Sequence, residues 1–144
     1  MKVIIDTNVA VSGLLWSGPP NQIMRWIRDK LLIAYGFEKT TEELNKTLNY
    51  VKFLKRLQEL DTTPEEVFAY FMNLIHYVPV PKNIPGIIKK DLFDNIFLAL
   101  AVQNDVSLVI SGDDHLLSKK EYKNIQIVTP QEACQVIEAF KRIG

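Results

Sequence analysis

Short apolar runs recur along the chain, separated by longer segments whose apolar residues are spaced as on one face of a helix. The first run, Val3-Ile4-Ile5, shows no alternation, which is typical of a strand buried on both faces of a parallel sheet. Further strands are predicted at residues 31–35, 77–80, 107–110 and 125–128. Because Pro79 has no N–H to donate, the strand that contains it is predicted to lie at an edge of the sheet.

Helices are predicted between these strands, at residues 7–16, 21–30, 40–48, 52–60, 63–74, 91–103 and from 129 onward. Three of them begin with a threonine followed by a glutamate three residues later, the signature of a capping box. These pairs are Thr40 with Glu43, Thr63 with Glu66, and Thr129 with Glu132. Residues 96–102 are apolar on every side, which predicts a centrally buried helix. The alternation of strands and helices predicts a doubly wound α/β fold with a parallel sheet of about five strands.

Composition and charge narrow the possible functions. The chain has 144 residues, 47% of them hydrophobic, which suits one domain with a real core, residues 1–144. Its formal net charge is zero, so no global basic field indicates nucleic acid, although a local patch would not show in the sum. One cysteine, Cys134, excludes an intrachain disulfide. No signal peptide fits before Asp6 and no apolar run approaches the ~20 residues of a membrane span, so we expect a cytoplasmic protein without membrane contact.

Acids follow two of the predicted strands. Asp6 comes directly after the first strand, and Asp113 follows the strand at 107–110. Ligands bind at the carboxyl edge of open α/β sheets, so these two carboxylates are predicted to meet there. An acid at a strand end can instead cap the next helix. Two like charges held close together are costly unless a cation neutralises them, which favours a functional site.

Three more acids are candidates. Asp91 and Asp94 lie three residues apart, on one face of the first turn of the apolar helix. Acids are also favoured at helix N-termini for purely structural reasons, but Asp94 borders a buried stretch where an unpaired carboxylate is costly. Glu43 occupies the third helical position of a capping box, so the pattern by itself favours a structural role for it.

An oxygen-only cluster of carboxylates suits Mg²⁺ or Mn²⁺ and not Zn²⁺. Such sites commonly activate water for attack on a phosphodiester. Asn8 and Ser111 are neutral groups placed to orient ligands or that water, and Thr7 lies between Asp6 and Asn8. The basic group Lys52, Lys55 and Arg56 is interpreted as a solvated face, with phosphate binding as the alternative.

Four segments together resemble the PIN-domain nucleases. They are Val3 to Val9; Glu43-Leu44 with Leu48, Lys52 and Phe53; Asp91 to Asn95 with Leu98-Ala99; and Ser111-Gly112-Asp113 with Leu116-Leu117. The match covers nearly the whole chain in the family's order and spacing. The most similar group is the toxin components of bacterial and archaeal toxin–antitoxin modules, the VapC-type ribonucleases.

This resemblance implies a single three-layer α/β/α domain and Mg²⁺- or Mn²⁺-dependent cleavage of RNA. It also implies a homodimer and inhibition by a cognate antitoxin protein. The acidic quartet becomes Asp6, Glu43, Asp94 and Asp113, acting as metal ligands and catalytic groups. The supporting polar groups are Asn8, Asp91, Ser111 and Thr7. Ser111 stands where the family more often has threonine. The spacing from Glu43 to Phe53 matches the family's spacing better than an alignment that uses Glu42.

Three other classes share some of these features. A phosphoacceptor receiver domain would have a lysine after its last strand, but Thr129-Pro130 stands there. A haloacid-dehalogenase-like phosphatase would have a second aspartate where this chain has Asn8. A PIN fold that binds RNA or protein without cutting is the remaining alternative. The four mutually repelling acids argue against it, because a silent copy has no reason to keep them.

Overall fold

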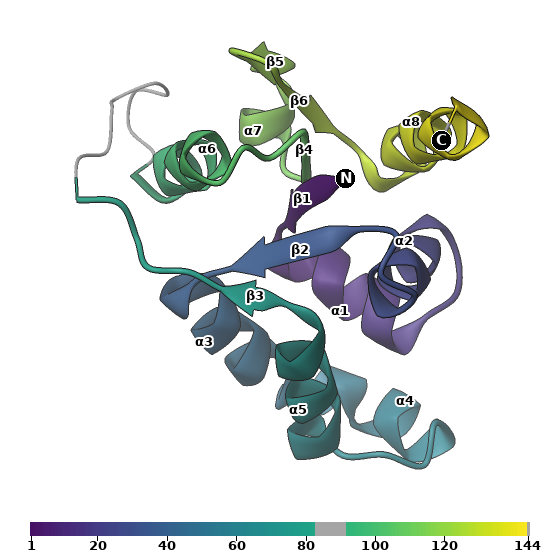
Figure 1. The fold of residues 1–144 in the computed structure, drawn as a ribbon. Helices are drawn as coiled ribbons and strands as arrows, with labels where there is room; N and C mark the ends of the chain where they lie inside the picture. The colour runs from purple at the N-terminus through teal and green to yellow at the C-terminus, as the bar shows by residue number, and fades with distance from the viewer. Residues whose placement is uncertain (83–91, 144) are drawn as a thin grey trace.

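The computed structural model describes residues 1–82 and 92–143, with only the backbone described for 92–94. Its centre is a six-stranded sheet with the strand order β3-β2-β1-β4-β6-β5 (Figure 1). The strands are β1 (Lys2–Ile5), β2 (Ile33–Gly36), β3 (His76–Tyr77), β4 (Leu108–Ile110), β5 (Glu121–Tyr122) and β6 (Ile125–Val128). All neighbouring strands are parallel except β5 and β6. The predicted α/β fold with a central, mostly parallel sheet is therefore confirmed. The strand predicted at 77–80 does lie at an edge, but it is shorter and ends at Tyr77, so Pro79 is not part of it.

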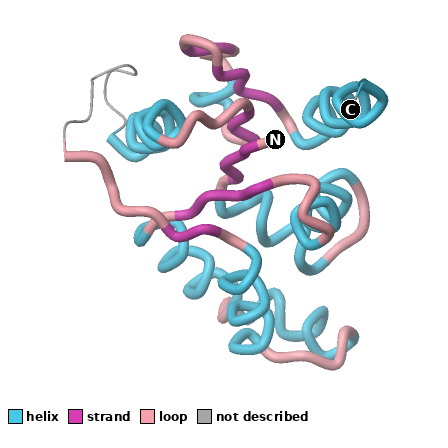
Figure 2. The backbone as a smooth tube through the Cα atoms, in the orientation of Figure 1, coloured by secondary structure: helices cyan, strands magenta, loops and turns pink. Residues whose placement is uncertain are grey.

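The helices lie on both sides of this sheet (Figures 1 and 2). They are α1 (Thr7–Leu15), α2 (Pro19–Arg28), α3 (Glu38–Leu48), α4 (Leu54–Glu59), α5 (Pro64–Leu74), α6 (Leu92–Gln103), α7 (Asp114–Leu117) and α8 (Pro130–Ile143), with a 3-10 turn η1 (Val51–Phe53) before α4. One buried cluster joins the sheet to α1, α2, α8 and the α3–α5 segment, and a second joins it to α6 and α7. The result is the three-layer α/β/α arrangement.

Strand β1 contributes to both clusters, as its apolar run predicts. Val3 and Ile5 face the first cluster, whereas Ile4 faces the second. Successive side chains of a strand point to opposite faces, so a strand covered by helices on both sides needs apolar residues throughout. All three residues are at most 5% exposed. This burial fixes where the strand ends, and therefore where Asp6 lies.

Helix α6 is buried through most of its predicted apolar stretch. Its residues 97–101 are buried, but Val102 is 38% exposed. The prediction of a helix covered on every side is therefore wrong at that end. Because α6 belongs to an outer layer of the three, it packs on the sheet with one face and presents part of the other to solvent.

The start of α3 differs from the prediction. The helix begins at Glu38 and its N-cap is Phe37, so the capping box with Thr40 as the cap is wrong. Thr40 acts from inside the first turn instead. Its Oγ1 accepts a hydrogen bond from the Phe37 N–H at 3.2 Å and donates one to the Phe37 carbonyl at 2.9 Å. Glu43 consequently lies in the second turn of α3, where it cannot cap the helix.

Two short elements were not predicted. Strand β5 has two residues and pairs antiparallel with β6, and α7 is a single turn after Asp113. Neither contains enough residues to show a periodic pattern. Helix α2 begins at Pro19, two residues before the predicted start at residue 21, because prolines are tolerated in the first turn of a helix.

We expect Gly13→Ala to destabilise the protein, although alanine normally stabilises the interior of a helix. A Cβ at Gly13 would lie 2.6 Å from the backbone oxygen of Pro20 and 2.6 Å from Cγ of Met24. Overpacking of this kind costs about 1–3 kcal/mol, which outweighs the ~0.5–1 kcal/mol gained from alanine's helix propensity. Thermal unfolding measures the change. Gly112→Ala is the control, since its Cβ would meet nothing within 4 Å; equal melting temperatures for the two variants would contradict the prediction.

The start of α8 predicts a specific pH dependence. Thr129 N–H donates to the Glu132 carboxylate at 3.0 Å, and Glu132 N–H donates to Thr129 Oγ1 at 3.2 Å, a complete capping box. The hydrogen bonds from Thr129 lower the pKa of Glu132 below its ordinary 4.5. Their stabilisation is therefore present above pH 4.5 and is lost as the pH falls through the lowered pKa. Wild type should melt above Glu132→Gln at pH 7, and the difference should shrink as the pH falls below 4.5 and through the lowered pKa of Glu132; a pH-independent difference would contradict this.

Candidate active site

The site lies where the order of the strands reverses direction. From β1 the chain passes to β2 on one side, and β4 lies on the other side. Such a switch point opens a crevice at the carboxyl ends of the strands. Ile5 of β1 pairs with Ile110 of β4, and the Asp6 N–H continues the ladder by donating to the Ile110 carbonyl at 3.1 Å. This register places Asp6 beside Ser111.

Asp6 is buried, and both of its carboxylate oxygens are bound. Oδ1 accepts a hydrogen bond from the Val9 N–H at 2.8 Å, so Asp6 is the N-cap of α1. Oδ2 accepts from the Ser111 hydroxyl at 2.5 Å and from the Gly112 N–H at 3.2 Å. The capping interpretation of Asp6 is therefore correct, but two of its three donors come from the loop after β4. These hydrogen bonds fix the Asp6 carboxylate at the carboxyl ends of β1 and β4.

Ser111 connects Asp6 to Asp113. Its hydroxyl is fully buried, donates to Asp6 and accepts a hydrogen bond from the Asp113 N–H at 2.9 Å. Asp113 is exposed and caps the short helix α7 by accepting from the His115 N–H at 2.7 Å. Because only one of its oxygens is used in this cap, the Asp113 carboxylate keeps acceptor sites for a ligand.

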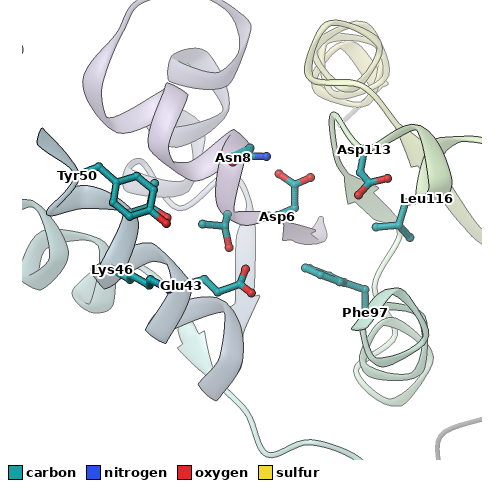
Figure 3. Close-up of a pocket in the computed structure, with 10 residues that line it drawn as sticks. Asp6, Asn8, Glu43, Lys46, Tyr50, Phe97, Asp113 and Leu116 are labelled. Carbon is teal, nitrogen blue, oxygen red and sulfur yellow. The ribbon is translucent and has the colours of Figure 1, made fainter. Parts of the chain in front are cut away.

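Glu43 enters the site from the opposite wall (Figure 3). A cavity of about 290 Å³ lies between α3 and the strand ends. Its described lining is Asp6, Thr7, Asn8, Glu43, Lys46, Thr47, Tyr50, Phe97, Asp113 and Leu116. Glu43 is half-buried in this lining, whereas the neighbouring Glu42 is exposed. The structure thus brings Asp6, Glu43 and Asp113 to one cavity from three separate elements.

Two predicted site residues fall outside this description. Asp91 lies outside the described residues. Asp94 belongs to the first turn of α6, and its side chain is likewise outside the described part of the chain. Thr7 and Asn8 both line the cavity.

Sequence reasoning missed five of the lining residues: Lys46, Thr47, Tyr50, Phe97 and Leu116. A signal for three of them was available. Lys46, Thr47 and Tyr50 follow Glu43 by three, four and seven residues, which is the spacing of one helical face. Once Glu43 faces the cavity, its neighbours on that face are expected to do so too. Phe97 and Leu116 are buried core residues that also line the cavity, and no local sequence pattern distinguishes them from the rest of the core.

The ligand atoms available in the cavity are of the type that a hard divalent cation binds. The described acceptors are carboxylate, hydroxyl and amide oxygens, with no histidine or cysteine among the lining residues. Among the described residues, the buried Thr7 Oγ1 has no hydrogen-bond partner, so one more oxygen is unsatisfied there. Within the described residues, however, no three acidic, histidine or cysteine side chains are close enough to form a metal-holding group. The description excludes the Asp94 side chain, so the full quartet stays a prediction.

The fold and the site define an α/β protein with an acid-lined cavity at a topological switch point. The sequence profile of the PIN domain matches residues 2–115, and this chain therefore belongs to the PIN domain family. PIN domains are typically nucleases, and PIN nucleases generally use divalent metal ions.

Comparison with solved structures supports the same fold. The crystal structure of PAE2754 from Pyrobaculum aerophilum is similar with a TM-score of 0.62 and 12% sequence identity, covering 96% of this chain and 99% of that chain. At this identity the likeness shows the fold alone. A search of curated proteins finds no match. Among the described residues, no helix combines the length and apolarity needed to cross a bilayer.

Proposed function

We propose that this protein is a metal-dependent endoribonuclease in which Asp6, Glu43, Asp94 and Asp113 hold Mg²⁺ or Mn²⁺. The observation that carries the proposal is the convergence of Asp6, Glu43 and Asp113 on one cavity in a PIN fold. None of these three acids forms an ion pair with a described residue. Like-charged carboxylates held near one another without ion-pair partners are costly, and a bound divalent cation removes that cost.

The contacts of each cavity residue suggest its role in the proposed reaction. A bound divalent cation supplies an activated water and neutralises charge on the phosphodiester. Asp6 is held rigidly by the Ser111 hydroxyl and the Gly112 N–H, so its orientation is set before any ligand arrives. Thr7 offers an unsatisfied hydroxyl and Asn8 an amide with which to orient water or a phosphate oxygen. Lys46 is the cationic side chain in the described lining and complements the charge of a phosphate.

The resemblance to VapC-type ribonucleases supports a more specific role, as the toxin of a toxin–antitoxin module. In that role the protein forms a homodimer and is inhibited by a cognate antitoxin. Size-exclusion chromatography with light scattering tests the dimer. Co-purification with the product of a neighbouring small open reading frame tests the antitoxin, and a monomer without any such partner would refute this role while leaving the nuclease proposal intact.

A catalytically silent PIN module that binds RNA or protein is the second candidate. It is favoured by one observation, the lack of a three-ligand metal group among the described side chains. Incubation of labelled single-stranded RNA with Mn²⁺, Mg²⁺ or EDTA separates the two. Cleavage with either metal and none with EDTA supports the nuclease. Cleavage that survives EDTA refutes the metal, and RNA binding without cleavage supports the silent module.

We expect Mn²⁺ to raise the melting temperature of the protein. A ligand that binds only the native state stabilises it by about 2.7 kcal/mol at 100 times its Kd, enough to shift the transition by several degrees. Differential scanning fluorimetry with EDTA as the reference measures the shift. Glu43→Gln should reduce it and Glu42→Gln should not. No shift at millimolar Mn²⁺ would contradict metal binding by the native state.

A further inference from the structure

An aromatic and basic surface borders the acid cavity. It follows the end of α3, where Tyr50 lines the cavity and yet is 42% exposed. Lys46 stands one helical turn earlier on the same cavity wall, and Lys52 lies two residues after Tyr50 in η1. We call Lys46, Tyr50 and Lys52 the Tyr50 corner. Figure 3 shows Tyr50 and Lys46 on the side of the cavity opposite to Asp113 and Leu116.

The Tyr50 corner rests on a fixed base. Phe53, the last residue of η1, packs edge-on against Trp16 with ring centroids 5.7 Å apart. Its N–H donates to the Tyr50 carbonyl at 3.0 Å, which ties the backbone of Tyr50 to η1. Arg56 completes the anchor, because its Nε donates to the Leu15 carbonyl at 2.6 Å while its guanidinium lies over Trp16. The backbone that presents Tyr50 is thus attached to the end of α1, the helix that Asp6 caps.

The charges of the Tyr50 corner oppose those of the cavity. Lys52 Nζ lies 6.0 Å from the centroid of the Tyr50 ring and 5.1 Å from that of Phe53. Neither Lys46 nor Lys52 forms an ion pair with a described residue. Two unpaired ammonium groups therefore flank an exposed aromatic ring at the edge of an acidic cavity. A polyanion that reaches the acids from this side meets cations first.

We propose that the Tyr50 ring stacks one base of single-stranded RNA and that Lys46 and Lys52 bind the adjacent phosphates. Aromatic rings beside cations that track a backbone are how proteins bind single strands, and the bases of a duplex are already stacked on one another. The Tyr50 corner would thereby hold the strand so that a neighbouring phosphodiester enters the acid cavity. Tyr50 is a positioning residue in this scheme. The inference rests on the proposed function for the identity of the ligand, but its test does not require cleavage.

The test uses a 2′-O-methyl oligoribonucleotide, which resists hydrolysis, with 2-aminopurine as the base probe. Base–aromatic stacking contributes about 1–3 kcal/mol, so Tyr50→Ala should weaken binding at least about fivefold in fluorescence anisotropy. The quenching of 2-aminopurine by wild type should be lost in Tyr50→Ala and kept in Tyr50→Phe, which retains the ring. Tyr70→Ala is the matched control, because Tyr70 is similarly exposed at 45% but lies on α5.

A salt titration tests the two lysines. Each phosphate contact contributes about −0.7 to the slope of log K against log salt for single strands. Lys46→Gln and Lys52→Gln should each make the slope shallower by about that amount, whereas Arg142→Gln, at the exposed end of α8, should leave it unchanged. An equal change in all three variants would refute specific phosphate contacts by this pair.

Four outcomes would overturn RNA binding by the Tyr50 corner. In the first two, wild type fails to bind the oligonucleotide, or Tyr50→Ala binds it as tightly as wild type does. In the other two, Tyr70→Ala loses as much affinity as Tyr50→Ala, or a duplex of the same sequence depends on Tyr50 to the same extent. If wild type binds a protein partner, and Tyr50→Ala abolishes that binding but leaves RNA binding unchanged, the Tyr50 corner is a protein-docking face instead.

The nuclease proposal and the Tyr50 corner can be refuted independently. If RNA binds in a Tyr50-dependent way but is not cleaved, the nuclease proposal is refuted and the role of the Tyr50 corner stands. If RNA is cleaved and KM is unchanged in Tyr50→Ala, the role of the Tyr50 corner is refuted and the nuclease proposal stands.

Discussion

Glu43→Gln is expected to lower the rate of RNA cleavage about 100-fold or more, because a metal-site carboxylate loses its charge while its shape is kept. Glu43 is well suited to this test. It lines the cavity and accepts no hydrogen bond from a described residue, so the amide should leave the fold unchanged. Asp6 is less suitable. Its carboxylate accepts three hydrogen bonds, and Asp6→Asn would leave a donor in a place where acceptors are needed.

The neighbouring residue supplies a matched control. Glu42 has the same charge and lies on the same helix, but its side chain is exposed and does not line the cavity. Glu42→Gln should therefore retain wild-type kcat/KM with a labelled RNA substrate. Equal melting temperatures for the two variants would show that the loss in Glu43→Gln is chemical. A Glu43→Gln variant as active as Glu42→Gln would remove Glu43 from the site.

The strand-end part of the site could be predicted because it depends on local pattern and sheet geometry. The apolar run before Asp6 fixes the end of β1, and the run before Ser111 fixes the end of β4. Parallel strands in register then bring the next residues of both together. The hydrogen bonds from Ser111 and Gly112 to Asp6 are the direct consequence.

The cavity wall formed by α3 and the residues after it (Glu43, Lys46, Thr47 and Tyr50), here called the α3 wall, could not be predicted in the same way. Local pattern favoured Thr40 as the cap and a structural role for Glu43, whereas the helix begins earlier, after Phe37. What fixes that start is the burial of the Phe37 ring against Phe97, about sixty residues away along the chain. Contacts at such separation have no local signature, so tertiary packing overrode the capping signal. The same error hid Lys46 and Tyr50, whose relation to the cavity depends on the face that α3 presents.

The packing that sets this face gives the largest expected effect on stability. Phe37 is fully buried, and its ring meets Phe97 at a centroid distance of 5.5 Å with an interplanar angle of 83°. Truncation of a buried phenylalanine typically costs about 3–5 kcal/mol, so Phe37→Ala should unfold at markedly lower urea concentrations than wild type. Phe140→Ala is the control, since Phe140 is 40% exposed on α8 and should cost little.

The same substitution tests how the fold holds the site. Phe37 is the residue from which α3 begins, and Asp6 follows the neighbouring strand, so the Phe37 ring helps to set the position of Glu43 relative to Asp6. Phe37→Ala should therefore reduce cleavage under conditions where circular dichroism shows the variant still folded, whereas Phe140→Ala should not. A folded Phe37→Ala variant with wild-type kcat/KM would mean that the α3 wall is held by other contacts and that Phe37 serves stability alone.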